Sequence, residues 1–433
     1  MKRIYSDYAY SSAPRSTCWW DETIEAPDWP ILHGALSVDV AIIGGGFTGI
    51  SAALHLAETG ASVAVFEAES PGWGASGRNG GFCCLGGSKL SETTLVRRYA
   101  EKGADAYFQA EKDAVSLVAE LLTRHGIDAD RHSRGETQLA HSKRAMERLR
   151  RNSNAQGLLH ERHELADLGL GGAFFGGYTT PVGFGLNPRK YLFGLADAAR
   201  TKGAGLYQQS TIQKISKTTQ GFDLQTSTGH VRASKVLLCT NGYSSEDLHP
   251  WMAARYMPTQ STAFVTRALS QDELQSQGWT SDQIAYDTRN LLHYFRLMPD
   301  GRFLFGMRGG LMSSPSAESR IRQKALRDFR RLFPAWASID VTHIWSGMVC
   351  LARDLVPFAG PVPGQAGAFA GFAYHGNGVA MGTYCGRALA QLALGQPSEL
   401  PLPIERPPSR FPLGRWRRAL MPPAYALLGL ADL

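Results

Sequence analysis

The glycine run Gly44-Gly45-Gly46-Phe47-Thr48-Gly49 constrains the fold of this chain more than any other stretch. An apolar segment, residues 38–43, leads into the run, and small apolar residues at helical spacing follow it over residues 50–59. A second apolar segment, residues 62–66, ends at Glu67, whose carboxylate is expected to accept hydrogen bonds from ribose hydroxyls. Strand, tight turn, helix and strand within about 30 residues are typical of a βαβ unit, so the run predicts a Rossmann-type dinucleotide site.

Each position of the run has a physical role in such a site. Gly44 permits the tight turn, Gly46 lets the backbone approach a pyrophosphate, and Gly49 lets the helix and strand pack closely. The helix that begins near Phe47 and Thr48 supplies N–H groups and a partial positive charge to the phosphates. The run alone does not distinguish NAD from FAD.

Length and composition fit a globular protein of two or three domains. The chain has 433 residues, of which 43% are apolar, and its formal charge of +7 is spread along the sequence, which argues against nucleic-acid binding. The six cysteines have no metal-ligand spacing, so neither a metal site nor a disulfide framework is expected. With no secretory signal and no run of about 18 apolar residues, a cytoplasmic location is expected.

Changes of pattern along the chain predict an α/β fold built from separated segments. A Rossmann-like nucleotide-binding domain is expected from three of them, residues 37–95, 187–247 and 343–395. The insertions between them, residues 96–186 and 248–342, are expected to form a substrate domain with an antiparallel sheet. Residues 1–36 form an N-terminal extension and residues 396–433 a basic C-terminal segment. Within the second nucleotide-binding segment, residues 206–215 predict one strand.

Three further stretches resemble the D-amino-acid-oxidase-like family of FAD-dependent oxidoreductases. The first is the loop Gly72-Trp73-Gly74-Ala75-Ser76-Gly77-Arg78-Asn79-Gly80-Gly81 after the second strand. The second is Asn187-Pro188 with the following segment that ends in Thr240-Asn241-Gly242-Tyr243. The third pairs Trp345-Ser346-Gly347 with the loop Gly376-Asn377-Gly378-Val379. The resemblance spans about residues 38–395 and implies that the dinucleotide is FAD.

The resemblance also implies which residues hold the cofactor. The loop after the second strand runs beside the flavin ring, and the backbone of the loop at 376–379 faces its pyrimidine end, where N–H groups stabilise negative charge. Beyond the glycine run and Glu67, the implied cofactor-binding residues are Gly74, Ala75, Ser76, Arg78, Asn79, Gly80, Ile212, Thr240, Asn241, Gly242, Gly347, Gly376, Asn377, Gly378 and Val379. Relatives that attach the flavin covalently use a His or a Cys at positions where this chain has neither, so non-covalent FAD is predicted.

The loop at 72–81 is most similar to that of the gamma-glutamylputrescine oxidoreductase branch. This resemblance implies oxidation of an amine C–N bond by hydride transfer to flavin N5, giving an imine that water hydrolyses to an aldehyde. Relatives that oxidise α-amino acids place an Arg where this chain has Val349, and sarcosine oxidases place a Lys where it has Ala380. A carboxylate next to the reacting carbon would lie there without a counter-charge, which favours an amine substrate.

Four residues are candidates for handling the substrate. Arg296 and Arg308, on strands of the substrate domain, are candidates to bind a carboxylate remote from the reacting carbon. Tyr294 and His375 are candidates for closing the site over the amine and accepting its proton. Each has a structural alternative, because an Arg often pairs with a local acid and a His beside a glycine loop often only supports the backbone.

The electron acceptor and two other functions stay open. Sarcosine-type oxidases use a Lys near N5 on the strand that corresponds to residues 302–306, yet no Lys occurs here between Lys235 and Lys324, so the acceptor is either O2 or another electron acceptor. The alternative functions are oxidation of a secondary amino acid such as pipecolate or sarcosine, and a role as the flavin subunit of a larger electron-transfer or RNA-modifying assembly. The basic C-terminal segment suits weak contact with a membrane surface, although packing on the protein body is the simpler interpretation.

Overall fold

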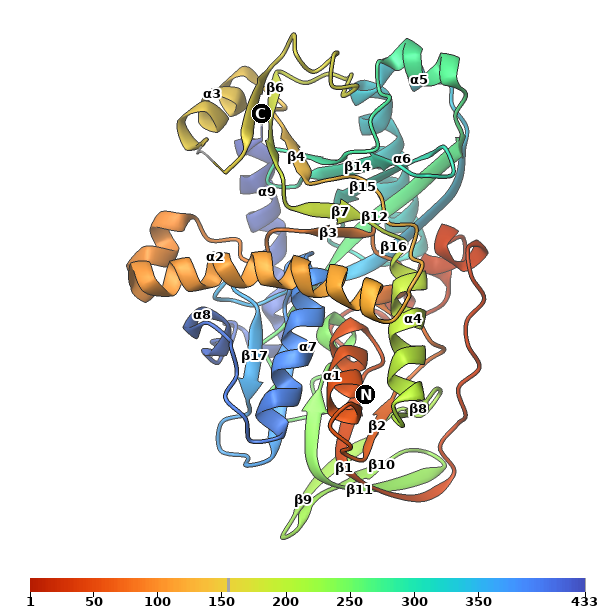
Figure 1. Cartoon of the computed structure of the whole chain (residues 1–433), viewed down its shortest axis with the longest axis vertical. Helices are drawn as coiled ribbons and strands as arrows, with labels where there is room; N and C mark the ends of the chain where they lie inside the picture. Colours follow the sequence, from red (N-terminus) through yellow and green to blue (C-terminus); the bar gives the residue numbers. More distant parts are fainter. Residues whose placement is uncertain (154–155, 433) are drawn as a thin grey trace.

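Two eight-stranded sheets, one with a parallel core and one largely antiparallel, form the two halves of the molecule in Figure 1. The structure is a computed structural model, and it describes residues 1–153 and 156–432. The mixed α/β fold predicted from the sequence is confirmed.

The first sheet has the order β17-β18-β11-β1-β2-β8, and an antiparallel ribbon of β9 and β10 extends it at β11. Neighbouring strands from β8 through β18 run parallel. Strand β1 is central, and its last four residues are fully buried, as expected for a strand covered on both faces. The strands are β1 (Gly34–Ile43), β2 (Val63–Phe66), β8 (Gly205–Tyr207), β9 (Lys214–Thr218), β10 (Gly221–Gln225), β11 (Gly229–Leu238), β17 (Phe358–Pro361) and β18 (Ala368–Phe372).

Helices α1 (Phe47–Ala57), α4 (Pro188–Thr201) and α7 (Ala380–Ala393) lie together against this sheet (Figure 1). Helices α1 and α7 cross closely, because a Cβ atom added at Gly386 would lie 2.4 Å from the carbonyl oxygen of Thr48. The small residue Gly386 therefore lets α7 pack closely against the N-terminal end of α1.

The second sheet has the order β16-β12-β15-β14-β13-β4-β6-β5. Its strands are β4 (Glu136–Leu139), β5 (Leu158–Glu161), β6 (Gly176–Thr180), β12 (Met257–Ala268), β13 (Ile284–Asp287), β14 (His293–Leu297), β15 (Arg302–Arg308) and β16 (Val341–Leu351). One face packs on α5 (Gln271–Gln277) and α6 (Pro315–Leu332) through a core of Phe and Trp side chains. Phe305 of β15, for example, contacts Phe329 of α6 with ring centroids 5.7 Å apart.

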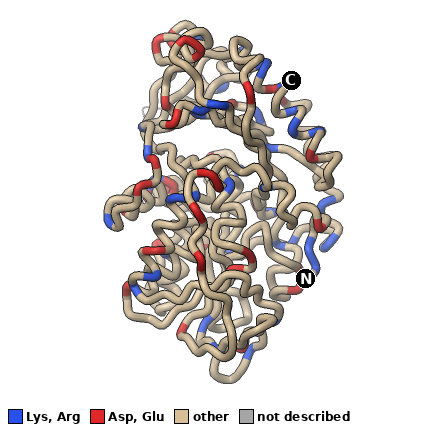
Figure 2. Tube along the Cα trace, turned by 90° about the vertical axis from the view of Figure 1, so that its right-hand side faces the viewer, with Lys and Arg blue, Asp and Glu red and all other residues tan. Residues whose placement is uncertain are grey.

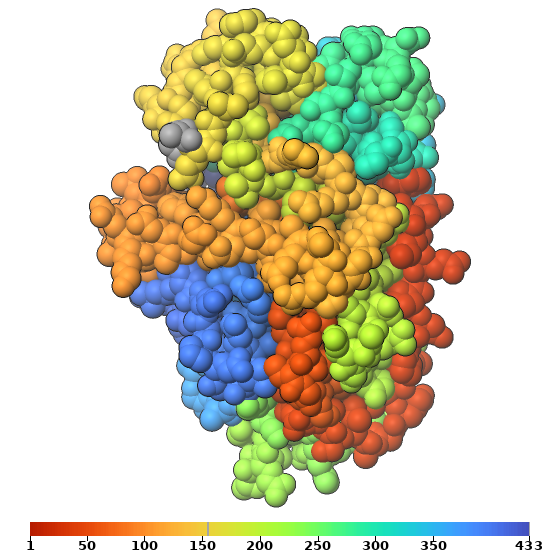
Figure 3. All heavy atoms as spheres, viewed as in Figure 1, coloured from red at the N-terminus to blue at the C-terminus, as the bar shows by residue number. Residues whose placement is uncertain are grey.

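Helix α2 (Glu92–Arg124) crosses between the two halves, and in Figure 3 its residues form a band across this face of the molecule. A short ribbon of β3 (Phe82–Cys84) and β7 (Gly183–Gly185) lies near it, and α3 (Lys143–Asn152) packs beside β6. The N-terminal extension contacts both halves: the Thr17 hydroxyl donates to the Ile344 carbonyl of β16 at 2.6 Å, and Asp21 pairs with Arg189 of α4 at 2.6 Å.

The C-terminal segment is partly packed on the body and partly exposed. It contains α8 (Leu402–Glu405), a 3-10 helix η7 (Gly414–Leu420) and α9 (Met421–Ala431). Arg417 is fully buried and pairs with Glu246 at 2.7 Å. Helix α9 is apolar in sequence, yet Met421 is its only buried residue.

Two sequence-based expectations differ from the structure. Residues 206–215, predicted as one strand, are divided between β8 and the start of β9, with residues 208–213 between them. Residues 343–351, assigned from sequence to the nucleotide-binding domain, lie in β16 at the edge of the second sheet. Strand β16 pairs with β12, so the long strand carries the chain from one half to the other.

Basic and acidic residues are interspersed along the trace in Figure 2. Among the helices of residues 1–153 and 156–432, none has both the length and the apolar content that crossing a bilayer requires.

Candidate active site

A cavity of about 820 Å³ lies between the two sheets. This volume is toward the upper end of the range usual for ligand pockets. Its walls come from loops at the ends of the first sheet and from the face of the second sheet that is opposite the aromatic core. Almost every residue implied from sequence as cofactor-binding lines it; Gly49 and Gly242 do not.

The glycine run forms one end of the cavity with a backbone that tolerates no side chains. Gly44 has a φ of +105°, and a Cβ atom there would lie 2.8 Å from the carbonyl oxygen of Cys239. At Gly46, a Cβ atom would lie 2.8 Å from the Ser76 hydroxyl, on the cavity side. Gly49 lies outside the cavity but at the close packing of α1 on β1, where a Cβ atom would be 2.0 Å from the Gly44 carbonyl. The turn at Gly44 and the close packing at Gly49 have the geometry expected from the sequence, and the approach of a pyrophosphate at Gly46 stays a prediction.

Glu67, which follows β2, lies directly over the glycine run. Its Oε2 accepts a hydrogen bond from the Gly45 N–H at 2.8 Å, and its Oε1 accepts one from the Glu69 N–H at 3.1 Å. Burial raises the pKa of this carboxyl group, and the backbone N–H donors partly offset the shift. The carboxylate retains lone pairs for the hydroxyl groups of a ribose.

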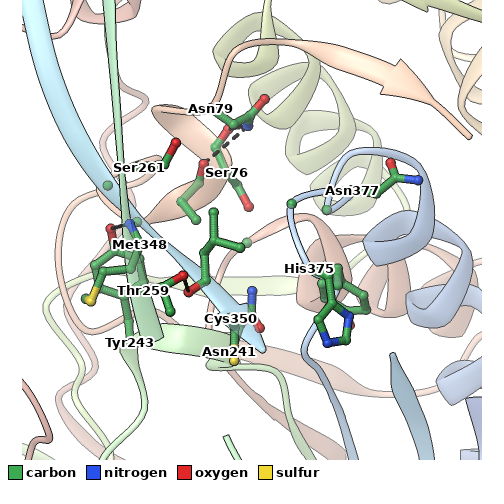
Figure 4. A pocket seen from close by; sticks show the side chains of 18 of the residues that line it. Ser76, Asn79, Asn241, Tyr243, Thr259, Ser261, Met348, Cys350, His375 and Asn377 are labelled. Carbon is green, nitrogen blue, oxygen red and sulfur yellow. Dashed lines mark hydrogen bonds between the residues drawn. The ribbon is translucent and has the colours of Figure 1, made fainter. Parts of the chain in front are cut away.

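The loop at 72–81 is held rigidly by its own side chains. The Arg78 guanidinium stacks on the Trp73 ring, 4.5 Å from its centroid, and donates to the carbonyl oxygens of Trp73 and Ser346. The Asn79 amide donates to the Ser76 carbonyl at 3.0 Å, a contact drawn in Figure 4. The Ser76 hydroxyl accepts from the Phe47 N–H at 3.0 Å, so this loop and the start of α1 form one wall.

The loops at 240–243 and 375–379 complete the cofactor side, and Figure 4 shows Asn241, His375 and Asn377 around the same space. The Asn241 Oδ1 accepts from the Ala373 N–H at 2.9 Å, and the Asn377 amide donates to the carbonyls of Cys84 and Gly86. Two buried oxygens in this wall, Thr240 Oγ1 and Asn377 Oδ1, have no hydrogen-bond partner within the described residues. A glycine cradle, a carboxylate and unpartnered buried oxygens fit a dinucleotide that supplies the missing partners.

The register of the second sheet places a row of polar side chains on the cavity face. Strand pairing aligns Ser261 with Arg308 and Tyr294 with Gly306, two residues before Arg308. Because side chains two residues apart share a face, these residues point to the same side. The row continues through Tyr286 on β13 to Gln138 and Glu136 on β4.

Three of the four predicted substrate-handling residues, Tyr294, Arg308 and His375, line the cavity. The Tyr294 hydroxyl lies 3.2 Å from the Ser261 hydroxyl, and its ring occupies the space that a side chain at Gly80 or Gly306 would fill. The Arg308 Nη2 donates to the His375 carbonyl at 2.5 Å, close to Gly376. Burial lowers the pKa of Arg308 and raises that of Tyr294.

Arg296 does not reach the cavity. It is 1% exposed, and its two terminal nitrogens contact His132 Nε2 at 2.9 Å and the Leu186 carbonyl at 2.8 Å. It also stacks near Trp20 and Phe82, which belong to the packing between the N-terminal extension and the second sheet. The structure therefore does not support a substrate-binding role for Arg296.

The His375 imidazole borders the cavity but has no nitrogen free for a substrate proton. Its Nδ1 donates to the Gly87 carbonyl at 2.6 Å, and its Nε2 accepts from the Ala352 N–H at 3.1 Å. Burial lowers the pKa of His375 to about 3, so the ring is neutral near pH 7. This arrangement is that of a residue supporting the loop, and it does not fit the expected proton acceptor.

Further titratable residues that the sequence interpretation did not single out lie in the cavity wall, among them Lys89, Glu136 and Tyr425. Lys89 lies on the loop after β3, outside residues 302–306, where the resemblance implied a lysine in sarcosine-type oxidases. Glu136 and Gln138 alternate along β4, and this two-residue period was the available signal for a shared face.

The two positions that argued against an adjacent carboxylate differ in their placement. Val349 lines the cavity on β16, so its apolar side chain is part of the wall. Ala380 begins α7, is fully buried and lies outside the cavity.

Comparisons with known proteins agree with this site. A family model described as FAD dependent oxidoreductase matches residues 39–392. The probable oxidoreductase OrdL of Rhizobium meliloti (strain 1021) is 33% identical over 430 residues, which cover 96% of this chain and 97% of that protein. Gamma-glutamylputrescine oxidoreductase of Escherichia coli (strain K12) is 28% identical over 393 residues, covering 89% of this chain and 91% of that protein.

Solved structures share the architecture. Glycine oxidase from Geobacillus kaustophilus matches with a TM-score of 0.69 at 21% identity, covering 85% of this chain and 96% of that one. The family match spans most of both sheets and the cavity-lining residues from Ile43 to Val379. The chain belongs to the FAD dependent oxidoreductase (DAO) family, and it is an FAD-dependent oxidoreductase.

Proposed function

We propose that this enzyme oxidises the C–N bond of an amine of the gamma-glutamylputrescine type. The observation that carries the proposal is the apolar wall at Val349, which leaves a carboxylate on the reacting carbon without a counter-charge at that position. The 28% identity with gamma-glutamylputrescine oxidoreductase over nearly the whole chain supports it. Bound FAD supplies the two-electron acceptor for the substrate carbon.

The residues that would hold FAD are those of the cofactor side of the cavity. The N–H groups at the start of α1 would face the pyrophosphate, and Glu67 the ribose. The loops at 74–80 and 376–379 would flank the flavin, with N–H groups at the start of α7 facing negative charge on it. Neither a His nor a Cys is proposed as a covalent link.

The chain's own part in the chemistry is to orient the amine and to favour its neutral form. A substrate ammonium must lose a proton before its carbon is oxidised. The Arg308 guanidinium is the largest cause of a lowered pKa at Lys89, and the same charge lowers the pKa of any ammonium bound beside it. Tyr294, protonated because burial raises its pKa, is a hydrogen-bond donor at the same face.

Anaerobic mixing of the purified yellow protein with a panel of amines and amino acids tests this function. We expect gamma-glutamylputrescine to bleach the flavin and simple α-amino acids to leave it oxidised. Strong reduction by α-amino acids, with none by N-acylated diamines, would overturn the proposal. The assay does not depend on the physiological acceptor, which is O2 or another electron acceptor.

A second candidate is oxidation of a secondary amino acid, and one observation favours it. Arg308 uses one of its five N–H donors on the His375 carbonyl, so its fork has donors left for a substrate carboxylate. Reduction of the flavin by sarcosine or pipecolate, abolished by Arg308→Met, would select this candidate.

We also propose weak contact between the C-terminal segment and an anionic membrane surface. Leu427 and Leu430 of α9 and Trp416 of η7 are 68%, 67% and 67% exposed. Arg410 and Arg415 are exposed on the same segment, and their charge complements anionic lipid.

A further inference from the structure

Glu136 and Lys89 form a pair of opposite polarity in the cavity wall that the proposed chemistry does not use. Glu136 is 5% exposed, and its Oε2 has no hydrogen-bond partner among the described residues. Within the same part of the chain, no hydrogen bond or ion pair involves the Lys89 ammonium, and none joins it to Glu136. A buried carboxylate oxygen ordinarily has a partner, whereas the exposed Lys89 ammonium at the cavity wall is accessible to a ligand.

The backbone holds both residues firmly. Glu136 lies on β4 between β13 and β6, with its side chain on the cavity face of the sheet. Lys89 lies on the opposite wall, where its N–H donates to the Leu355 carbonyl at 2.9 Å. The Asn377 amide fixes the same loop through the Gly86 carbonyl at 2.8 Å.

The surroundings push each group away from its charged form. Burial raises the pKa of Glu136 to about 8, and nearby Glu111 adds to the shift. The Arg308 charge is the largest cause that lowers the pKa of Lys89 to about 7. A bound ligand that brought the opposite charge to each group would reverse both effects.

Glu136 lies away from the part of the cavity where the amine is oxidised. Tyr294 lies against Gly80, in the loop that would flank the flavin. Strand β4 is two strands from Tyr294 on β14, with β13 between them. At ordinary strand spacing this separation is roughly 10 Å, so the far end of an extended substrate would reach Glu136.

We propose that Glu136 and Lys89 bind the ammonium and the carboxylate of an α-amino-acid head group at the substrate end remote from the oxidised amine. The proposal rests on the proposed amine oxidation and names the class of its substrate: amines whose far end is a zwitterion. Glu136 accepts from the ammonium, and Lys89 donates to the carboxylate.

Ligands without the reacting amine test this site separately from catalysis. γ-Glutamyl-n-butylamide keeps both head-group charges, glutaryl-n-butylamide lacks the ammonium, and the α-carboxamide of the first ligand lacks the carboxylate. Their dissociation constants for the FAD-loaded enzyme are measured from the perturbation of the flavin absorbance. We expect wild type to prefer the zwitterion over each partial analogue by about 10- to 100-fold, as for hydrogen bonds between charged groups.

Two variants separate the two contacts. Glu136→Gln should abolish the preference for the zwitterion over the ligand that lacks the ammonium, and keep its preference over the ligand that lacks the carboxylate. Lys89→Met should have the opposite effect on the two preferences. Glu101→Gln, the same change on an exposed part of α2, should alter neither ratio. A variant that simply misfolded would lose affinity for all three ligands and would not produce this crossed pattern.

The outcomes distinguish failure of this inference from failure of the proposed function. If gamma-glutamylputrescine reduces the flavin but the zwitterion binds no better than its analogues, or does not bind, the head-group site is wrong and amine oxidation stands. If Glu136→Gln keeps the ammonium preference, the assignment of Glu136 is wrong. If no amine reduces the flavin, the proposed function itself fails.

Discussion

The cofactor wall and the substrate wall of the cavity expose different chemical groups. The cofactor wall is made mostly of backbone, with glycines at 44, 46 and 376 and N–H groups at helix starts. The substrate wall is made of side chains from six neighbouring strands, including Tyr294, Arg308 and Glu136. A backbone wall admits few substitutions, whereas a side-chain wall changes its chemistry without changing the fold. The difference predicts that cofactor variants and substrate variants fail in different ways.

Gly46→Val should have the largest effect on the cofactor wall. A Cβ atom at this position already lies 2.8 Å from the Ser76 hydroxyl, so the larger side chain fills the space left for the dinucleotide. We expect the purified variant to lose nearly all bound flavin, measured as the ratio of absorbance at 450 nm to that at 280 nm. Gly429→Ala is the matched control, because a Cβ atom there meets nothing within 4 Å. Normal flavin content in Gly46→Val would contradict the inference that the dinucleotide needs the space left by the glycine at this position.

Arg308→Met should spare flavin binding and impair reduction by the amine. Removing this positive charge raises the pKa of a bound ammonium, so less neutral amine is present at pH 7. We expect the rate of anaerobic flavin reduction at pH 7 to fall about tenfold and to recover as the pH rises, consistent with a pKa shift of about one unit. A uniform loss at every pH would show that Arg308 acts in some other way.

Glu136→Gln should change the pH dependence of stability. A carboxyl group whose pKa is raised to about 8 in the folded state, from about 4.5, contributes stability below its unfolded pKa and loses it as the pH rises through 8. The Gln variant does not lose stability in this way. Its free energy of unfolding should equal that of the wild type at pH 5 and exceed it by a few kcal/mol at pH 9. Thermal unfolding of the two proteins at both pH values measures this, and a pH-independent difference would contradict it.

Replacing Leu427 and Leu430 by Gln should give the smallest effect, seen only with membranes. We expect several-fold weaker binding to vesicles of phosphatidylglycerol, and no change in flavin reduction. Leu402→Gln alters another exposed leucine, 60% exposed on α8, and serves as the control. Equal vesicle binding by the wild type, the double variant and Leu402→Gln would contradict the proposed membrane contact.

The contrast between the walls also explains what the sequence could predict. The glycine run, Glu67 and the 376–379 loop were recognisable because their roles depend on local backbone geometry. Glu136 and Lys89 were not, because only the pairing of β4 with β13 and the packing of the loop after β3 bring them to the same cavity. The turn that divides residues 206–215 has no glycine or proline to mark it, and Gln209 adopts a φ of +47° instead. The pairing of β16 with β12 is likewise set by tertiary contacts.

The parallel core has a consequence for how the enzyme matures. Strand β1 pairs with β2, about 20 residues later, but also with β11, which is about 190 residues later, and β18 follows only at residue 368. The FAD cradle is therefore complete only when most of the chain has been synthesised and closed. We therefore expect FAD to bind late in folding, so that flavin content reports completed folding of the whole protein. Because FAD binds only the completed cradle, added FAD should shift the last folding step toward the folded state by mass action.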